Sequence, residues 1–209
     1  MDVRRCVTAL VLGLATLCSV GGGGQPALAQ STLSVRGNVG ASFFRSPDLT
    51  RELLHSGTNV GLEAGIRVYR GLSVTVGVGY DGFTLNEDNA RLYGQEGSDL
   101  AFMGGNVGFR YTVENQSDAH PYVALGGGLY QVRRTNRQMV TSGGTLVPDE
   151  NRSTTTVEEG MHVAIGSLFR IDDTYAVFVE PRYMVFDVTE GVDEAVRYFT
   201  IRLGVDVQL

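Results

Sequence analysis

The C-terminal stretch Phe199-Thr-Ile-Arg-Leu-Gly-Val-Asp-Val-Gln-Leu209 alternates residue by residue between two kinds of side chain. Every odd-numbered position from Phe199 to Leu209 is apolar, and every even-numbered position is polar or is glycine. Successive side chains of a β-strand point to opposite faces, so this alternation predicts a strand with one apolar and one polar face. The stretch is 11 residues long, within the ~9–11 residues that a tilted strand needs to cross a bilayer.

The same alternation recurs in six further segments of the chain. They lie at residues 33–43, 59–68, 72–81, 106–113, 161–171 and 175–185. An additional segment at residues 121–132 is apolar or glycine on both faces, so the sequence leaves its phase ambiguous. We therefore expect eight strands. The 28 glycines, 5 prolines and absence of tryptophan also favour a β-protein over a helical one.

The links between these segments alternate in length along the chain. Three are short, at residues 70–71, 114–120 and 172–174, and four are long, at residues 44–58, 84–98, 133–156 and 186–195. Short turns at one end, long loops at the other and an even number of strands are typical of an outer-membrane barrel. The pattern predicts an all-β fold: an eight-stranded antiparallel up-and-down transmembrane β-barrel formed by residues 30–209.

The composition of the two faces indicates which one meets the lipid. The polar face is rich in small residues and arginine, which suits a narrow interior, whereas a soluble barrel would turn its apolar face inward. The apolar face carries branched aliphatic residues in mid-strand and aromatic residues toward the strand ends, as a lipid-facing band with interfacial girdles does. The aromatic positions assigned to this outer face are Phe43, Tyr80, Phe83, Tyr111, Phe169, Tyr175, Tyr183 and Phe199.

The first 29 residues have the pattern of a secretory signal peptide. Arg4 and Arg5 precede an apolar run at residues 7–20, and Ala27-Leu-Ala29 follows as a cleavage site, which we expect to be cut after Ala29. An N-terminal membrane anchor is the alternative. Both cysteines lie in this segment, so the mature chain would contain no disulfide and no cysteine metal site.

Two internal motifs and the terminal strand resemble one known family. The motifs are Pro121-Tyr-Val-Ala-Leu-Gly-Gly-Gly-Leu-Tyr130 and Val179-Glu-Pro-Arg-Tyr183. With the terminal strand, they make the chain similar to the small eight-stranded outer-membrane β-barrels, the group of the OmpA transmembrane domain and the OmpX-type proteins. The resemblance implies a Gram-negative cell outer membrane and insertion by the barrel assembly machinery, although this chain ends in Leu209 where the family usually ends in phenylalanine.

Nine charged residues occupy positions that the alternation turns toward the barrel interior. They are Arg36, Glu63, Arg67, Arg110, Arg170, Glu180, Arg182, Arg202 and Asp206. An eight-stranded barrel is only wide enough for side chains, and a buried charge needs a partner. We expect a structural network centred on Glu63 and Glu180, with Arg182 and Arg202, that plugs the lumen. A pore through the lumen is the alternative.

Several other chemistries are disfavoured by the sequence. Residues 77–82 fit a G-x-G-x-x-G pattern, but the strand alternation continues where a dinucleotide site needs a helix. His55, His120 and His162 are scattered, so we expect neither a metal site nor a cofactor. His162 also has the wrong phase for the outward His–Ser pair of a lipid A-modifying enzyme. The net charge is −6 and no basic run exists, which argues against nucleic acid as a partner.

The long loops are the remaining place for function. Their acidic residues are Glu87, Asp88, Glu96, Asp99, Asp187, Glu190, Asp193 and Glu194, and the mixed third loop carries Arg133, Arg134, Arg137, Asp149 and Glu150. We expect a non-catalytic outer-membrane protein with a structural or surface-interaction role, in contact with outer-membrane lipid and lipopolysaccharide. Its surface ligand is unidentified. The alternatives are a porin-like small-solute channel, a soluble periplasmic lipocalin-like ligand binder and a barrel enzyme acting on lipid.

Overall fold

The computed structural model describes residues 33–46, 48–86, 88–89, 98–136, 139–142, 145–148, 152–187 and 195–209. The expected signal peptide and its cleavage site lie outside these residues. The elements are β1 (Leu33–Ser46), α2 (Asp48–Leu53), β2 (Gly57–Tyr69), β3 (Leu72–Phe83), β4 (Ser98–Thr112), β5 (Ala119–Asn136), β6 (Met139–Ser142), β7 (Thr145–Pro148), β8 (Arg152–Arg170), β9 (Tyr175–Asp187) and β10 (Val196–Gln208). Within the described part of the chain, no helix is both long and apolar enough to cross a membrane.

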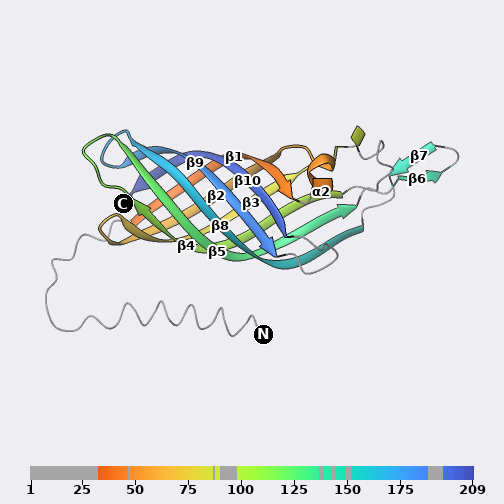
Figure 1. Ribbon diagram of the computed structural model, residues 1–209, viewed down its shortest axis with the longest axis horizontal. Helices are drawn as coiled ribbons and strands as arrows, with labels where there is room; N and C mark the ends of the chain where they lie inside the picture. Colours follow the sequence, from red (N-terminus) through yellow and green to blue (C-terminus); the bar gives the residue numbers. More distant parts are fainter. Residues whose placement is uncertain are drawn as a thin grey trace, which may run out of the picture. The chain divides into compact units, whose positions relative to one another are not determined.

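Eight of the strands form one closed barrel (Figure 1). Its order is β1-β10-β9-β8-β5-β4-β3-β2, with every neighbouring pair antiparallel. The first and last barrel strands close the ring, with Val39 opposite Leu203 and Phe43 opposite Phe199. Closure leaves no strand edge unpaired, which is the condition for a sheet to span a bilayer. The expected eight-stranded up-and-down barrel is therefore confirmed.

Two strands extend well beyond their predicted ends. Strands β5 and β8 are 18 and 19 residues long, against 12–15 residues for the other barrel strands. Their ladder continues to the pair Asn136–Arg152, through a stretch expected to be loop, and the separate β6–β7 hairpin follows within the same connection. The β-branched run at residues 154–157 explains the extension, because threonine and valine favour extended backbone.

The apolar face of the barrel is the outer face. Val39, Leu62 and Ile165 are 60–63% exposed in mid-strand, whereas Arg36 and Glu180 on the polar face are each 1% exposed. This is the orientation of a membrane barrel, and the lipocalin-like alternative, which needs an apolar cavity, is wrong.

One aromatic assignment to the outer face is also wrong. Phe83 is only 2% exposed and lies inside the barrel. Its odd number gives it the phase of the inward-facing Asp81, whereas the outward positions of β3 are even-numbered, as at Tyr80.

Glycines in β5 explain why its phase could not be read from the sequence. The inward positions include Tyr122 and Tyr130, with Gly126 and Gly128 between them. A Cβ at Gly128 would collide with the backbone carbonyl oxygen of Gly105 on β4. Glycine is therefore required by the close approach of two strands, and the polar signal that marks the inner face elsewhere is missing here.

Candidate functional site

The interior of the barrel is the candidate site, and a charged network occupies its middle. Glu63 on β2 accepts hydrogen bonds from Arg110 Nη1 on β4 at 2.9 Å and from Arg182 Nη2 on β9 at 3.4 Å. All three side chains are at most 10% exposed. A buried carboxylate between two guanidinium groups is neutralised from both sides, which offsets the cost of removing it from water.

A second carboxylate continues the network across the barrel. Glu180 on β9 accepts a 2.9 Å hydrogen bond from Arg182 Nε, and its Oε1 lies 2.8 Å from Arg202 Nη2 on β10. The Tyr122 hydroxyl donates to Glu180 Oε2 at 2.9 Å. Because Arg182 contacts both Glu63 and Glu180, the two carboxylates belong to one cluster that ties β2, β4, β5, β9 and β10 together.

A third acidic residue pairs with the remaining buried arginine. Arg36 Nε donates to Asp206 Oδ2 across the β1–β10 closure. The Arg36 guanidinium also lies 4.9 Å from the ring centroids of both Tyr122 and Phe178, a distance at which cation–π attraction operates. Its Nη1 and Nη2 atoms are buried and have no hydrogen-bond partner in the described part of the chain.

The nine sequence-predicted residues divide into two groups. Seven are buried in the lumen: Arg36, Glu63, Arg110, Glu180, Arg182, Arg202 and Asp206. The other two, Arg67 and Arg170, are exposed at the short-turn end of the barrel. Arg67 lies 3.8 Å from Glu114, with both side chains largely exposed, so this pair is outside the buried network. Strand alternation shows which face a residue is on, but not its depth along the barrel.

A smaller polar cluster adjoins the network, and the sequence did not single it out. Asp81 on β3 accepts hydrogen bonds from Ser42 Oγ at 2.6 Å, Asn59 Nδ2 at 2.9 Å and the Tyr198 hydroxyl at 3.0 Å. All four residues are buried. The alternation places Asp81 on the inner face, but only the register shows that neutral donors, not arginines, surround it.

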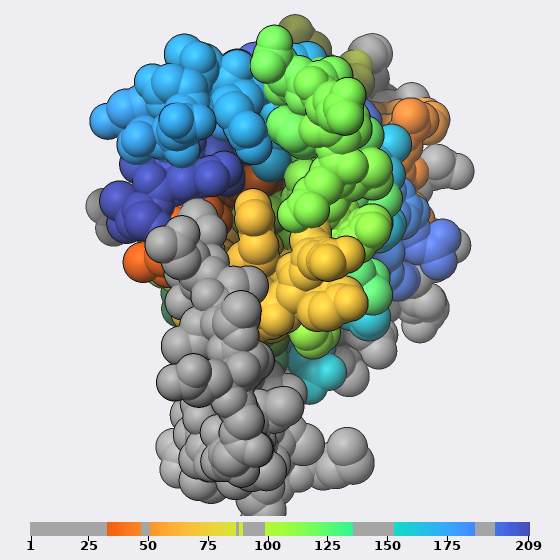
Figure 2. All heavy atoms as spheres, turned by 90° about the vertical axis from the view of Figure 1, so that its left-hand side faces the viewer, coloured from red at the N-terminus to blue at the C-terminus, as the bar shows by residue number. Residues whose placement is uncertain are grey.

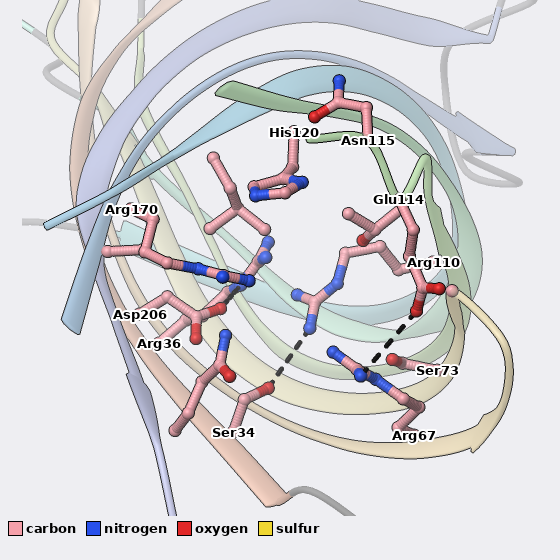
Figure 3. Close-up of a pocket in the computed structure, with 15 residues that line it drawn as sticks. Ser34, Arg36, Arg67, Ser73, Arg110, Glu114, Asn115, His120, Arg170 and Asp206 are labelled. Carbon is pink, nitrogen blue, oxygen red and sulfur yellow. Dashed lines mark hydrogen bonds and ion pairs between the residues drawn. The ribbon is translucent and has the colours of Figure 1, made fainter. Parts of the chain in front are cut away.

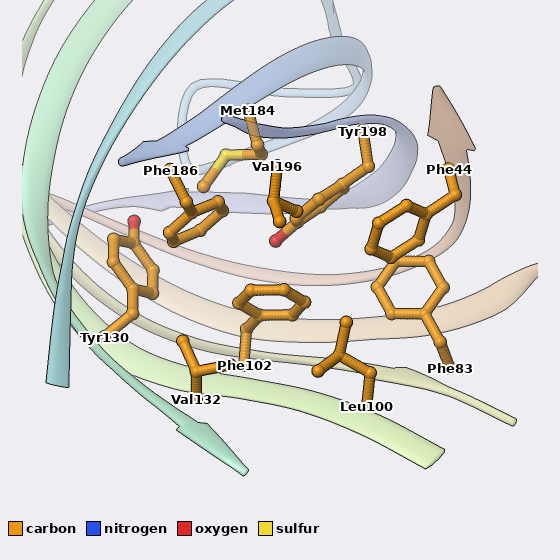
Figure 4. Packing of buried hydrophobic residues seen from close by; sticks show 10 residues of the cluster. All are labelled: Phe44, Phe83, Leu100, Phe102, Tyr130, Val132, Met184, Phe186, Val196 and Tyr198. Atoms are coloured by element: carbon orange, nitrogen blue, oxygen red, sulfur yellow. The ribbon is translucent and has the colours of Figure 1, made fainter. Parts of the chain in front are cut away.

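Aromatic side chains fill the lumen toward the long-loop end (Figure 4). The buried cluster, which we call the aromatic layer, comprises Phe44, Phe83, Leu100, Phe102, Tyr130, Val132, Met184, Phe186, Val196 and Tyr198. Phe102 and Phe186 are 4.7 Å apart between ring centroids, and Phe44 and Phe83 are separated by the same distance. The sequence did not indicate this layer, because several of its residues, such as Phe44, Phe102 and Phe186, lie beyond the ends of the predicted strands.

A cavity of about 240 Å³ occupies the opposite, short-turn end of the lumen (Figure 3). It is lined by Ser34, Arg36, Arg67, Gly71, Ser73, Arg110, Thr112, Glu114, Asn115, His120, Leu168, Arg170, Ala176, Asp206 and Gln208. Figure 2 looks onto this end, where the connections around residues 70–71 (yellow), 113–118 (green) and 171–174 (light blue) lie. We call this cavity the vestibule.

The histidines do not combine with other ligands in the described residues. His162 faces the lumen, as its phase predicts, and is 4% exposed. His120 lines the vestibule. No group of three or more histidine, cysteine, aspartate or glutamate side chains in the described ranges could hold a metal ion.

The chain belongs to the outer membrane protein β-barrel domain family, whose model matches residues 15–208. This membership places the protein in the outer membrane. Three solved structures have a similar fold, and the alignment with each covers 86% of this chain. Neisserial surface protein A has a TM-score of 0.56 and 17% identity, with 100% of its own chain covered. OprG of Pseudomonas aeruginosa has a TM-score of 0.53 and 10% identity, with 96% of its chain covered, and the attachment invasion locus protein Ail of Yersinia pestis has a TM-score of 0.51 and 12% identity, with 99% covered. No curated protein matches the sequence. At these identities the likeness concerns the fold alone.

Proposed function

We propose that this outer-membrane barrel is a non-catalytic protein with a closed lumen, and that it acts as a structural and surface-contact element. The filling of the lumen is the observation that carries the proposal. The aromatic layer occupies the long-loop end, the Asp81 cluster lies next to it, and the charged network crosses the middle. Phe102, Phe186 and Glu180 are each at most 1% exposed, so these layers are densely packed.

Conductance separates this proposal from the small-solute channel. Purified protein inserted into planar lipid bilayers should give no reproducible single-channel steps, because the buried ion pairs and the packed rings leave no continuous water path. Steps of constant size that change in Arg182→Gln would come from the lumen and would establish the channel instead. Steps of the same size in both proteins would originate outside the lumen.

The outer surface supports a role in contacting lipopolysaccharide. Phe43 and Phe199 are register partners on the outer face of β1 and β10, near the long-loop end. Arg45 and Arg197 lie two residues closer to the loops, and both side chains are exposed. Aromatic rings favour the membrane interface, and guanidinium groups just beyond it match the phosphates of an anionic lipid.

Binding to lipopolysaccharide tests this contact directly. The Arg45→Ser/Arg197→Ser double variant should bind purified lipopolysaccharide several-fold more weakly than the parent protein in co-sedimentation. Arg70→Ser is the matched control, because Arg70 is an exposed arginine in the turn at the opposite end of the barrel. Equal binding by the parent protein and the double variant would refute this contact.

The non-catalytic part of the proposal has its own test. Cells that express the protein should contain lipid A of the same mass as cells that lack it, measured by mass spectrometry of extracted lipid A. The inward orientation of His162 supports this expectation, because an enzyme acting on lipid needs its catalytic histidine on the outer face. A shift by the mass of one acyl chain would instead identify a lipid A-modifying enzyme.

A further inference from the structure

The vestibule carries an excess of positive charge in a protein that is acidic as a whole. The chain has a formal net charge of −6, yet four arginines line this one cavity: Arg36, Arg67, Arg110 and Arg170. Among the described residues, only two acidic side chains, those of Glu114 and Asp206, line it with them. Such a concentration of guanidinium groups around a recess focuses a positive potential inside it.

The arginines of the vestibule are not fully neutralised by their neighbours. Asp206 accepts a hydrogen bond from Arg36 only at Nε, so both Nη atoms of this buried side chain lack partners. Glu114 lies 3.8 Å from Arg67, in an exposed and therefore weak pair. Within the described residues, the Arg170 side chain has no hydrogen-bond or ion-pair partner.

The geometry suits a small anion. Figure 3 shows Arg110 and Arg170 extending into the cavity from opposite walls. Arg110 is held in place by its hydrogen bonds to Glu63 at 2.9 Å and to Ser34 Oγ at 3.2 Å. The volume of about 240 Å³ is below the ~300–1,000 Å³ of sites for drug-sized ligands. The oxygens of a tetrahedral oxyanion accept hydrogen bonds from several directions, so one anion can bind guanidinium groups that approach it from opposite walls.

We propose that the vestibule is a binding site for a phosphate-type oxyanion that enters from the short-turn side, which is the periplasmic side in this family. Arg170 and Arg110 would bind the anion, Arg36 would add positive potential from the inner wall, and Glu114 would oppose binding. The site needs no conducting lumen, so it stands apart from the closed-lumen proposal. Inorganic phosphate is the probe, and a phospholipid headgroup is the second source of the same chemistry.

Calorimetric titration of the folded protein in octyl glucoside, a detergent without phosphate, tests the site. Sodium phosphate should bind saturably with one anion per chain, measured against sodium chloride at equal ionic strength. Arg170→Gln should weaken binding up to about fivefold, because an exposed charged contact contributes up to about 1 kcal/mol. Glu114→Gln should tighten binding, and it provides a variant whose effect cannot be mistaken for misfolding. Arg133→Gln, an exposed arginine on β5 toward the long loops, is the control and should bind like the parent protein.

Two results would overturn the proposal. One is the absence of saturable phosphate binding by protein that is folded, as judged by its heat-dependent gel migration. The other is an equal loss of affinity in Arg170→Gln and Arg133→Gln, which would reflect net charge instead of a site. Phosphatidylglycerol added to the micelles distinguishes the two sources of the oxyanion. If the lipid competes with inorganic phosphate, the natural ligand is a phospholipid headgroup. If phosphate binding is unchanged, the natural ligand is the free anion.

Discussion

Replacement of Glu180 by alanine is the most direct test of the charged network. Glu180 is 1% exposed, and its carboxylate contacts Arg182 at 2.9 Å, Arg202 at 2.8 Å and the Tyr122 hydroxyl at 2.9 Å. The substitution removes all three contacts. It leaves the buried cations Arg182 and Arg202 with fewer counter-charges. Glu63, 3.4 Å from Arg182, is then the carboxylate that remains in this cluster.

The size of the effect follows from these contacts. Hydrogen bonds to charged groups contribute about 1.5–3 kcal/mol each, so the two from Arg182 and Tyr122 set a gross value of about 3–6 kcal/mol, to which the ion pair with Arg202 adds. Arg182 retains Glu63, which places the net loss lower, at the about 3–5 kcal/mol typical of breaking a buried pair. Glu114→Ala is the matched control. It breaks the exposed Arg67–Glu114 pair and should change the free energy of unfolding by less than about 1 kcal/mol.

Equilibrium unfolding in urea, with the protein in lipid vesicles, measures both variants. The chain contains no tryptophan, so the folded fraction is followed by far-ultraviolet circular dichroism and by the migration of unboiled samples on gels. Glu180→Gln serves if the alanine variant does not fold, because the amide preserves the shape and removes only the charge. A free energy of unfolding for Glu180→Ala within about 1 kcal/mol of the parent protein would refute the argument that the network stabilises the barrel.

Three further substitutions test other parts of the structure in the same unfolding assay. Phe102→Ala removes a ring from the centre of the aromatic layer and should cost about 3–5 kcal/mol; no change would mean that the layer is loosely packed. Gly128→Ala should impair folding, because its Cβ would meet the Gly105 carbonyl. Gly79→Ala should fold normally, because its Cβ would lie 3.7 Å from the Val60 carbonyl oxygen, an ordinary contact; equal behaviour of the two variants would contradict the close strand approach. Leu62→Arg puts a charge on the lipid face and should cost about 2–4 kcal/mol, and a neutral result would argue against that face meeting lipid.

Sequence periodicity was sufficient to predict the barrel and to place seven charged residues on its inner face. The seven buried residues of the expected network were identified because charge on one face of an alternating strand has only the interior available to it. The pairings were only partly accessible. Glu63 and Glu180 were expected as centres, but the part of Arg110 in binding Glu63 depends on the stagger of β2 and β4 around the barrel.

The aromatic layer could not be predicted from the sequence. Phe44, Phe102, Phe186 and Tyr198 come from different strands, and each follows the inward phase of its own strand. In the sequence they lie just beyond the predicted strands, where the alternation that would assign them a face does not reach. These residues form one layer because closure of the barrel brings the ends of β1, β4, β9 and β10 that carry them together.

The sequence by itself determined the number of barrel strands, the order in which they pair and, outside β5, the face that most side chains occupy. Strand periodicity and turn length are local properties, because they depend only on residues that are close together in the sequence. Only the tertiary structure decided how deep each side chain lies, which charges meet and where the lumen is filled or left open as the vestibule. These features depend on the stagger between strands, a relation between segments up to 170 residues apart, as for Arg36 and Asp206, and no local pattern encodes it.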